Sequence, residues 1–141
     1  MRLALISDIH ANLEALEATF YDIAERSIDR IVCLGDIVGY NSDAAACIAM
    51  IRGADCVCVA GNHDLAVCGR ITTRKFSSAA ARAVAWTREQ LSDDDLDFLE
   101  KALNVTDYDR LYIPGGAGAM SYGGSEFIRA ETFRRALDSG Q

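Results

Sequence analysis

Three short apolar runs in the first half of the chain each end in a cluster of polar residues. Runs of this length, without alternation of apolar and polar positions, are typical of strands buried on both faces of a parallel sheet. We therefore expect three strands, which cover about residues 2–7, 30–34 and 55–60.

The segments between these runs have the spacing of amphipathic helices. After the first run, apolar residues recur with helical spacing at Leu13, Leu16, Phe20 and Ile23. This spacing predicts a helix that begins near Ala11 or Asn12. A second helix is expected to end near Arg52, with Ser42 as its N-cap. The resulting β-α-β-α-β order predicts an α/β fold with a parallel sheet and right-handed crossovers.

The pattern changes after the third run. Residues 62–75 are polar and irregular, and we expect no regular element there. An alanine-rich helix is expected over 76–90, and Ser92 with Asp95 has the pattern of a capping box for a short helix that ends near Ala102. The remaining elements expected are a strand over 108–113, an irregular glycine-rich stretch over 115–124 and a helix over about 126–137.

Composition and charge narrow the class of protein. The chain has 141 residues and a net charge of −7. An acidic balance argues against a nucleic-acid or anionic-membrane surface, because such surfaces need clustered Lys and Arg. No apolar run is long enough to span a membrane, and the N-terminal run is too short for the core of a signal peptide. We therefore expect a cytoplasmic protein with neither membrane nor nucleic-acid partners.

The polar clusters contain residue types that hold metal ions. They are Ser7-Asp8-Ile9-His10, Gly35-Asp36 and Gly61-Asn62-His63-Asp64. Asp8 and His10 are two residues apart, so on an extended backbone their side chains would project to the same side. Carboxylates with an imidazole suit a borderline divalent cation. The first pair alone is better explained as a strand end and helix cap, and Gly35-Asp36 alone as a turn. All three clusters at the ends of neighbouring parallel strands indicate a metal site.

In this order, and each after a strand, the clusters resemble the signature of the calcineurin-like metallophosphoesterases. That signature reads D-x-H, then G-D-x-x, then G-N-H-D or G-N-H-E. The present residues are Asp8-Ile9-His10, Gly35-Asp36-Ile37-Val38 and Gly61-Asn62-His63-Asp64. The extended forms of the first two motifs are similar to a bacterial and archaeal branch of small phosphodiesterases. The resemblance covers about residues 1–103, as the N-terminal portion of the family's two-sheet sandwich, and leaves 104–141 as a divergent tail.

The resemblance implies a dinuclear site that hydrolyses a phosphodiester or phosphomonoester with a metal-activated water. Two divalent ions (Mn, Fe, Co, Ni or Zn) would be bound, the first by Asp8 and His10, with Asp36 bridging both and Asn62 binding the second. His63 would serve the leaving group as a proton donor or stabiliser of charge, and Asp64 would hold His63 in orientation. Asn62 and His63 would also contact the substrate, a small phosphorylated molecule.

The sequence departs from the family pattern after His63. The family completes its site with a histidine after a later strand and then a G-H-x-H motif, whereas this sequence has two histidines, His10 and His63. Three interpretations stay open. The chain is an active phosphoesterase, or a catalytically poor module that binds metal or phosphate, or the remnant of a truncated or frameshifted gene. A remnant would expose an unpaired sheet edge and would self-associate.

Overall fold

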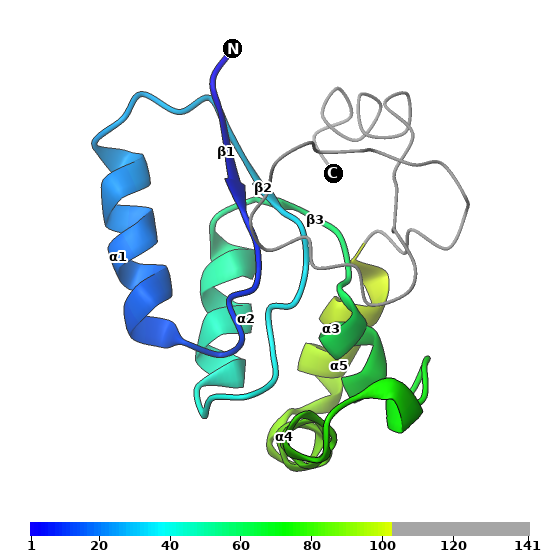
Figure 1. Cartoon of the computed structure of the whole chain (residues 1–141). Coiled ribbons are helices and arrows are strands. Elements are labelled where there is room, and N and C mark those ends of the chain that lie inside the picture. The colour runs from blue at the N-terminus through cyan, green and yellow to red at the C-terminus, as the bar shows by residue number, and fades with distance from the viewer. Residues whose placement is uncertain (103–141) are drawn as a thin grey trace. The chain divides into compact units, whose positions relative to one another are not determined.

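The computed structural model describes residues 1–102, in which helices pack on a parallel β-sheet (Figure 1). Its elements are β1 (Leu3–Ile6), α1 (Leu13–Ala24), β2 (Arg30–Cys33), α2 (Ala44–Gly53), β3 (Val57–Cys58), α3 (Asn62–Val67), the 3-10 helix η1 (Thr73–Lys75), α4 (Ser78–Gln90) and α5 (Asp93–Lys101). The chain divides into two units, Met1–Leu103 and Asn104–Gln141, and the described residues belong to the first. The elements predicted over 108–113, 115–124 and 126–137 lie outside the described residues.

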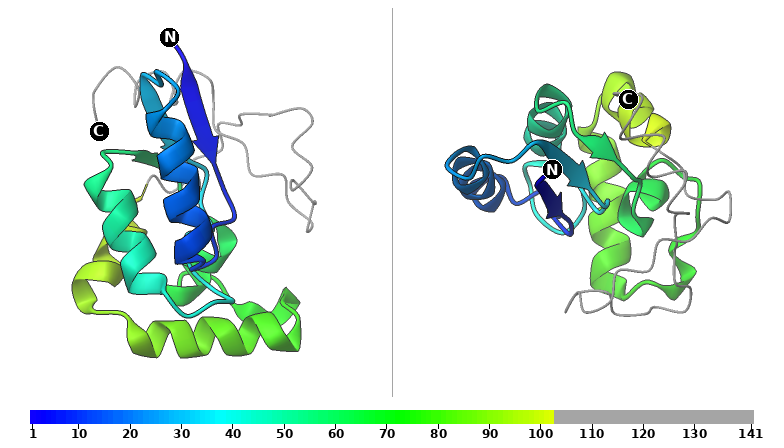
Figure 2. Two further views of the ribbon diagram at one scale, coloured as in Figure 1. Left: turned by 90° about the vertical axis from the view of Figure 1, so that its left-hand side faces the viewer. Right: turned by 90° about the horizontal axis from the view of Figure 1, so that it is seen from above.

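The sheet has the strand order β1-β2-β3, and both neighbouring pairs are parallel. Helices α1 and α2 lie on the same face of this sheet (Figures 1 and 2), as right-handed crossovers between sequential strands require. The predicted α/β fold is therefore confirmed. None of the helices within residues 1–102 is long and apolar enough to cross a membrane.

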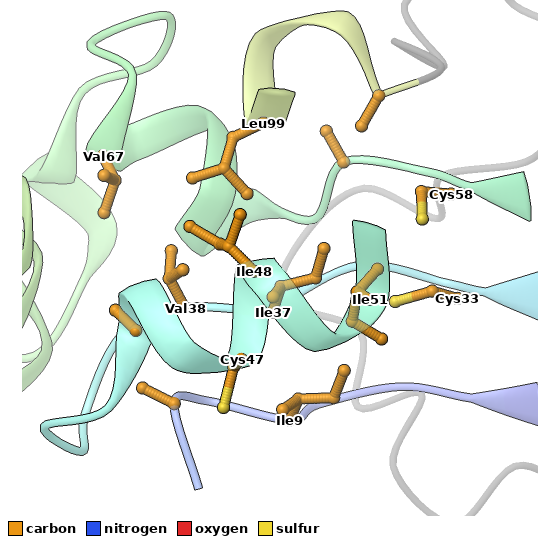
Figure 3. Close-up of a cluster of buried hydrophobic side chains, with 14 of the residues drawn as sticks. Ile9, Cys33, Ile37, Val38, Cys47, Ile48, Ile51, Cys58, Val67 and Leu99 are labelled. Carbon is orange, nitrogen blue, oxygen red and sulfur yellow. The ribbon is translucent and has the colours of Figure 1, made fainter. Parts of the chain in front are cut away.

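The hydrophobic core lies between the sheet and the helices (Figure 3). Cys33 and Cys58, which are partners in the β2–β3 register, belong to the same buried cluster as Ile48 and Ile51 of α2. Residues of the strand-to-helix loops join this cluster: Ile9 after β1, and Ile37 and Val38 after β2. Because these apolar side chains anchor both loops in the core, the polar residues next to them in the sequence are held at fixed positions.

Some predicted boundaries differ from the structure, among them the start of α4, which is Ser78 and not residue 76. Helix α2 has Asp43 and not Ser42 as its N-cap. The Ser42 hydroxyl donates to Asp43 Oδ2 (2.8 Å), and the Asp43 side chain caps no backbone N–H. Strand β3 is only Val57–Cys58, although Val59 N still donates to Cys33 O (2.9 Å) beyond its end.

The prediction that residues 62–75 are irregular is wrong, because they contain α3 and η1. The Asp64 carboxylate accepts a hydrogen bond from Gly61 N (2.9 Å), the N-cap residue of α3. A carboxylate that satisfies the backbone donors at a helix start stabilises the first turn. The polar residues interpreted as a loop are therefore the beginning of a short helix.

The capping box predicted at Ser92 is present at the start of α5. Asp95 N donates to Ser92 Oγ and Ser92 N donates to Asp95 Oδ2, both at 3.2 Å. We expect Ser92→Ala to lower the free energy of unfolding by about 1 kcal/mol, measured by urea denaturation of the full chain. Ser42→Ala is the matched control, because that hydroxyl caps no helix, and it should change stability by less than about 0.5 kcal/mol. Equal effects of the two substitutions would contradict the capping role.

Candidate metal centre

Three of the predicted ligands converge at the carboxyl ends of β1 and β2. Asp8 and His10 lie in the loop after β1 and Asp36 lies in the loop after β2. Each offers one ligand atom, and these atoms all lie within 4.8 Å of one another. Such spacing allows all three side chains to reach one cation with small rotamer changes.

Asp8 and His10 do not converge in the way that the sequence suggested. The backbone there is not extended: φ is 55° at Asp8, 49° at His10 and 54° at Asp36. These values lie in the left-handed region, which is uncommon for residues other than glycine. Hydrogen bonds between the loops hold the conformation, from Asp8 N to Gly35 O (3.2 Å) and from His10 N to Asp36 O (2.9 Å). The predicted extended backbone is wrong, and a strained pair of loops brings the ligands together instead.

The loop after β3 packs directly against Asp36. A Cβ atom built on Gly61 would lie 2.3 Å from both the N and the Oδ1 of Asp36, so glycine is required for this approach. Two residues later, His63 N donates to Asp36 Oδ1 (2.8 Å). This hydrogen bond fixes the orientation of the Asp36 carboxylate relative to the start of α3.

His10 is oriented so that one ring nitrogen is free. Its Nδ1 lies 3.2 Å from the carbonyl oxygen of Val38, and because a carbonyl only accepts, Nδ1 carries the proton. The Nε2 atom is 3.7 Å from Asp8 Oδ1, and in the neutral ring with this tautomer it carries the lone pair. A backbone carbonyl that fixes the tautomer in this way is the usual outer support of a metal-binding histidine.

His63 is buried beside this cluster, with 5% of its surface exposed. Its ring centroid lies 4.8 Å from that of His10, 4.7 Å from Tyr40 and 4.9 Å from Phe76. Burial lowers the pKa of His63, while the charge of Asp36 opposes the shift. Within residues 1–102 the buried Nδ1 atom has no hydrogen-bond partner. The His63 ring therefore lies at the site with one nitrogen, Nδ1, whose hydrogen-bonding capacity is unused among the described residues.

Asp64 is fully buried and links two loops. Its Oδ1 accepts from Val38 N (3.1 Å) and its Oδ2 accepts from Gly61 N (2.9 Å). Burial raises the pKa of this carboxyl to about 7. Both of these partners are backbone groups. Asp64 therefore joins the loop after β2 to the start of α3. Its predicted role in orienting the His63 ring stays a prediction.

Asn62 is the first residue of α3 and is half-buried. It lies between Gly61 and His63, and the backbone of both neighbours contacts Asp36. This position is compatible with the predicted role of Asn62 as a metal ligand. Its metal and substrate contacts, and the substrate contact of His63, stay predictions.

Sequence reasoning missed the two aromatic rings on His63. Phe76 was expected to start the alanine-rich helix, but it directly follows η1. Tyr40 was included in the extended form of the second motif, Gly35 to Tyr40, but no contact with His63 was predicted for it. Tyr40 also has a left-handed backbone, with φ of 63°. The available signal was Gly39-Tyr40 placed directly after the second motif, where a glycine turn can bring a side chain back to the site.

A sequence model described as calcineurin-like phosphoesterase matches residues 1–138. The chain belongs to this family. As a calcineurin-like phosphoesterase, it carries the family's first three motifs at the site described above. The family match continues past residue 103, where we expected the resemblance to end.

Two proteins are similar to the first part of this chain. Uncharacterized protein MJ0912 of Methanocaldococcus jannaschii is 45% identical over 98 residues, which cover 70% of this chain and 40% of that protein. The crystal structure of a metallophosphoesterase from Sphaerobacter thermophilus is 43% identical, with a TM-score of 0.58, and the match covers 72% of this chain and 41% of that one. The chain therefore spans about two fifths of the length of these two proteins.

Proposed function

We propose that this chain supplies the metal-binding part of a phosphoesterase that hydrolyses a small phosphodiester or phosphomonoester at a dinuclear site. The observation that supports this most is the convergence of Asp8, His10 and Asp36, whose ligand atoms lie within 4.8 Å of one another. The 43% identity to the Sphaerobacter thermophilus metallophosphoesterase supports the same class of reaction.

The donor set fits borderline divalent cations. Two carboxylates and one imidazole with a free Nε2 suit Mn, Fe, Co, Ni or Zn, and are a poor match for the all-oxygen shell of Ca or Mg. When bound, such ions supply Lewis-acid activation of the phosphate ester and of the attacking water.

The protein groups around the donors have separate tasks. Asp36 Oδ1 accepts from His63 N, so its second oxygen and remaining lone pairs stay available to serve two cations. His63, buried and favoured in its neutral form, is placed to give a hydrogen bond to the leaving group as negative charge develops there. Asp64 holds the two loops that carry these residues.

A second candidate function is binding of metal or phosphate without turnover. Among all 141 residues there are only two histidines, and both lie in the site already described. The chain thus offers fewer imidazoles than the family's complete dinuclear site. Metal stoichiometry separates the two functions, because an assembled catalytic site holds two ions per chain and a binding module holds one.

Hydrolysis of bis(p-nitrophenyl) phosphate tests the proposal. The full chain is stripped with chelator, reloaded with Mn, Co or Ni, and assayed for release of nitrophenolate, while bound metal is counted by mass spectrometry. We expect metal-dependent turnover that chelator abolishes. Metal binding without turnover would favour the binding module, and absence of both metal binding and turnover would contradict the proposed phosphoesterase.

A further inference from the structure

Tyr40 is a largely exposed aromatic side chain at the edge of the metal centre. Its surface is 53% exposed. Its ring meets that of His10 edge-on, at 4.8 Å and 85°, and lies tilted against that of His63, at 4.7 Å and 39°. One exposed ring therefore contacts both a predicted metal ligand, His10, and His63, the residue that we propose serves the leaving group.

The position of this ring is fixed by the backbone. Tyr40 has a φ of 63°, which is costly for a bulky side chain and persists only where surrounding contacts enforce it. Those contacts come from Asn41, whose N donates to Gly39 O (2.9 Å) and whose Nδ2 donates to His10 O (2.9 Å). The turn that carries Tyr40 is thus tied to the loop that carries His10.

Packing alone does not account for this arrangement. Tyr40 is neither in the buried core nor among the partly buried residues packed against it. Tyr21 on α1 shows what an ordinary exposed tyrosine looks like here: it is 74% exposed and lies on a regular helix. Strained backbone is concentrated at functional sites, and an exposed aromatic ring there offers a flat apolar surface to a ligand.

We propose that Tyr40 is a stacking platform for a planar aromatic substituent of the phosphate ester, an aryl group or a nucleobase. This inference rests on the proposed function, because a phosphate near Asp8 and Asp36 would direct its substituent past His63 toward Tyr40. A tyrosine suits this task, since a rigid ring loses little entropy on stacking and accepts any planar partner.

Binding of non-hydrolysable phosphonates tests the inference without turnover. The full chain, loaded with Mn²⁺, is titrated by calorimetry with phenylphosphonate, methylphosphonate and the phosphonate analogue of AMP. We expect phenylphosphonate to bind about tenfold more tightly than methylphosphonate, the size expected for one stacked ring. A further gain with the AMP analogue identifies a nucleobase as the natural partner, and no gain identifies an aryl group.

Substitutions separate stacking from structural support. Tyr40→Leu should remove the preference for the phenyl compound and leave methylphosphonate affinity unchanged, while Tyr40→Phe and Tyr21→Leu should keep the preference. An equal loss for both phosphonates in Tyr40→Leu would overturn the inference, because Tyr40 would then only support the site. Equal affinity of the unsubstituted chain for both compounds would also overturn it while leaving the proposed function intact. If the chain bound neither, the proposed function would fail together with the inference.

Discussion

Asp36→Ala is expected to lower the affinity of the chain for Mn²⁺ by more than about 100-fold, since even supporting residues of metal sites are worth 10- to 100-fold. The Asp36 carboxylate faces the ligand atoms of Asp8 and His10, and as the predicted bridge it belongs to both ion positions. If Asp36 bridges two ions as predicted, its removal deletes one ligand of each. Calorimetric titration of the metal-stripped full chain with Mn²⁺ measures the effect.

Two variants control this experiment. Asp22→Ala removes an exposed carboxylate on α1 that pairs with Arg26 (2.6 Å), and it should leave Mn²⁺ affinity unchanged. Asp36→Asn keeps an oxygen that can accept from His63 N but removes the charge, and it should lose most of the affinity. Wild-type affinity in Asp36→Ala would refute the metal centre described here.

The strands and the order of the motifs could be predicted because buried parallel strands leave a simple signal. Each strand is a short unbroken apolar run, and polar residues directly after it must lie at the carboxyl edge of the sheet. That logic brings Asp8, His10 and Asp36 together without knowledge of side-chain positions. The capping box at Ser92 was equally predictable, because its hydrogen bonds join residues only three apart.

The rest of the site depends on contacts between distant residues, which leave no periodic signal. Aspartate is common in loops, and Asp64 was therefore predicted to lie in one. It is instead fully buried, where its carboxylate accepts a hydrogen bond from Val38 N, 26 positions earlier in the chain. The left-handed backbones of Asp8 and His10 are enforced by Gly35 O and Asp36 O of another loop. Local preference disfavours both arrangements, and tertiary hydrogen bonds override it.

Gly61→Ala is expected to lower the free energy of unfolding by about 2–3 kcal/mol, as overpacking in a tight site does. At Gly61 φ is −81°, which alanine tolerates, so the penalty is steric alone. The added Cβ would lie 2.3 Å from Asp36 N, a backbone atom that cannot rotate away. The loop after β3 would have to move off Asp36, and the hydrogen bond from His63 N to Asp36 Oδ1 would break.

Gly53→Ala is the matched control for Gly61→Ala. Gly53 ends α2, and a Cβ there would meet no atom within 4 Å. Alanine in a helix loses less entropy on folding than glycine, so Gly53→Ala should raise the free energy of unfolding by about 0.5–1 kcal/mol.

Urea denaturation with and without Mn²⁺ measures both variants. Saturating Mn²⁺ should stabilise Gly53→Ala as much as the unsubstituted chain, because ligands stabilise only a native site that binds them. In Gly61→Ala, by contrast, Mn²⁺ should add little to the free energy of unfolding. If Mn²⁺ stabilised this variant as much as the unsubstituted chain, the loop after β3 would not be what holds Asp36.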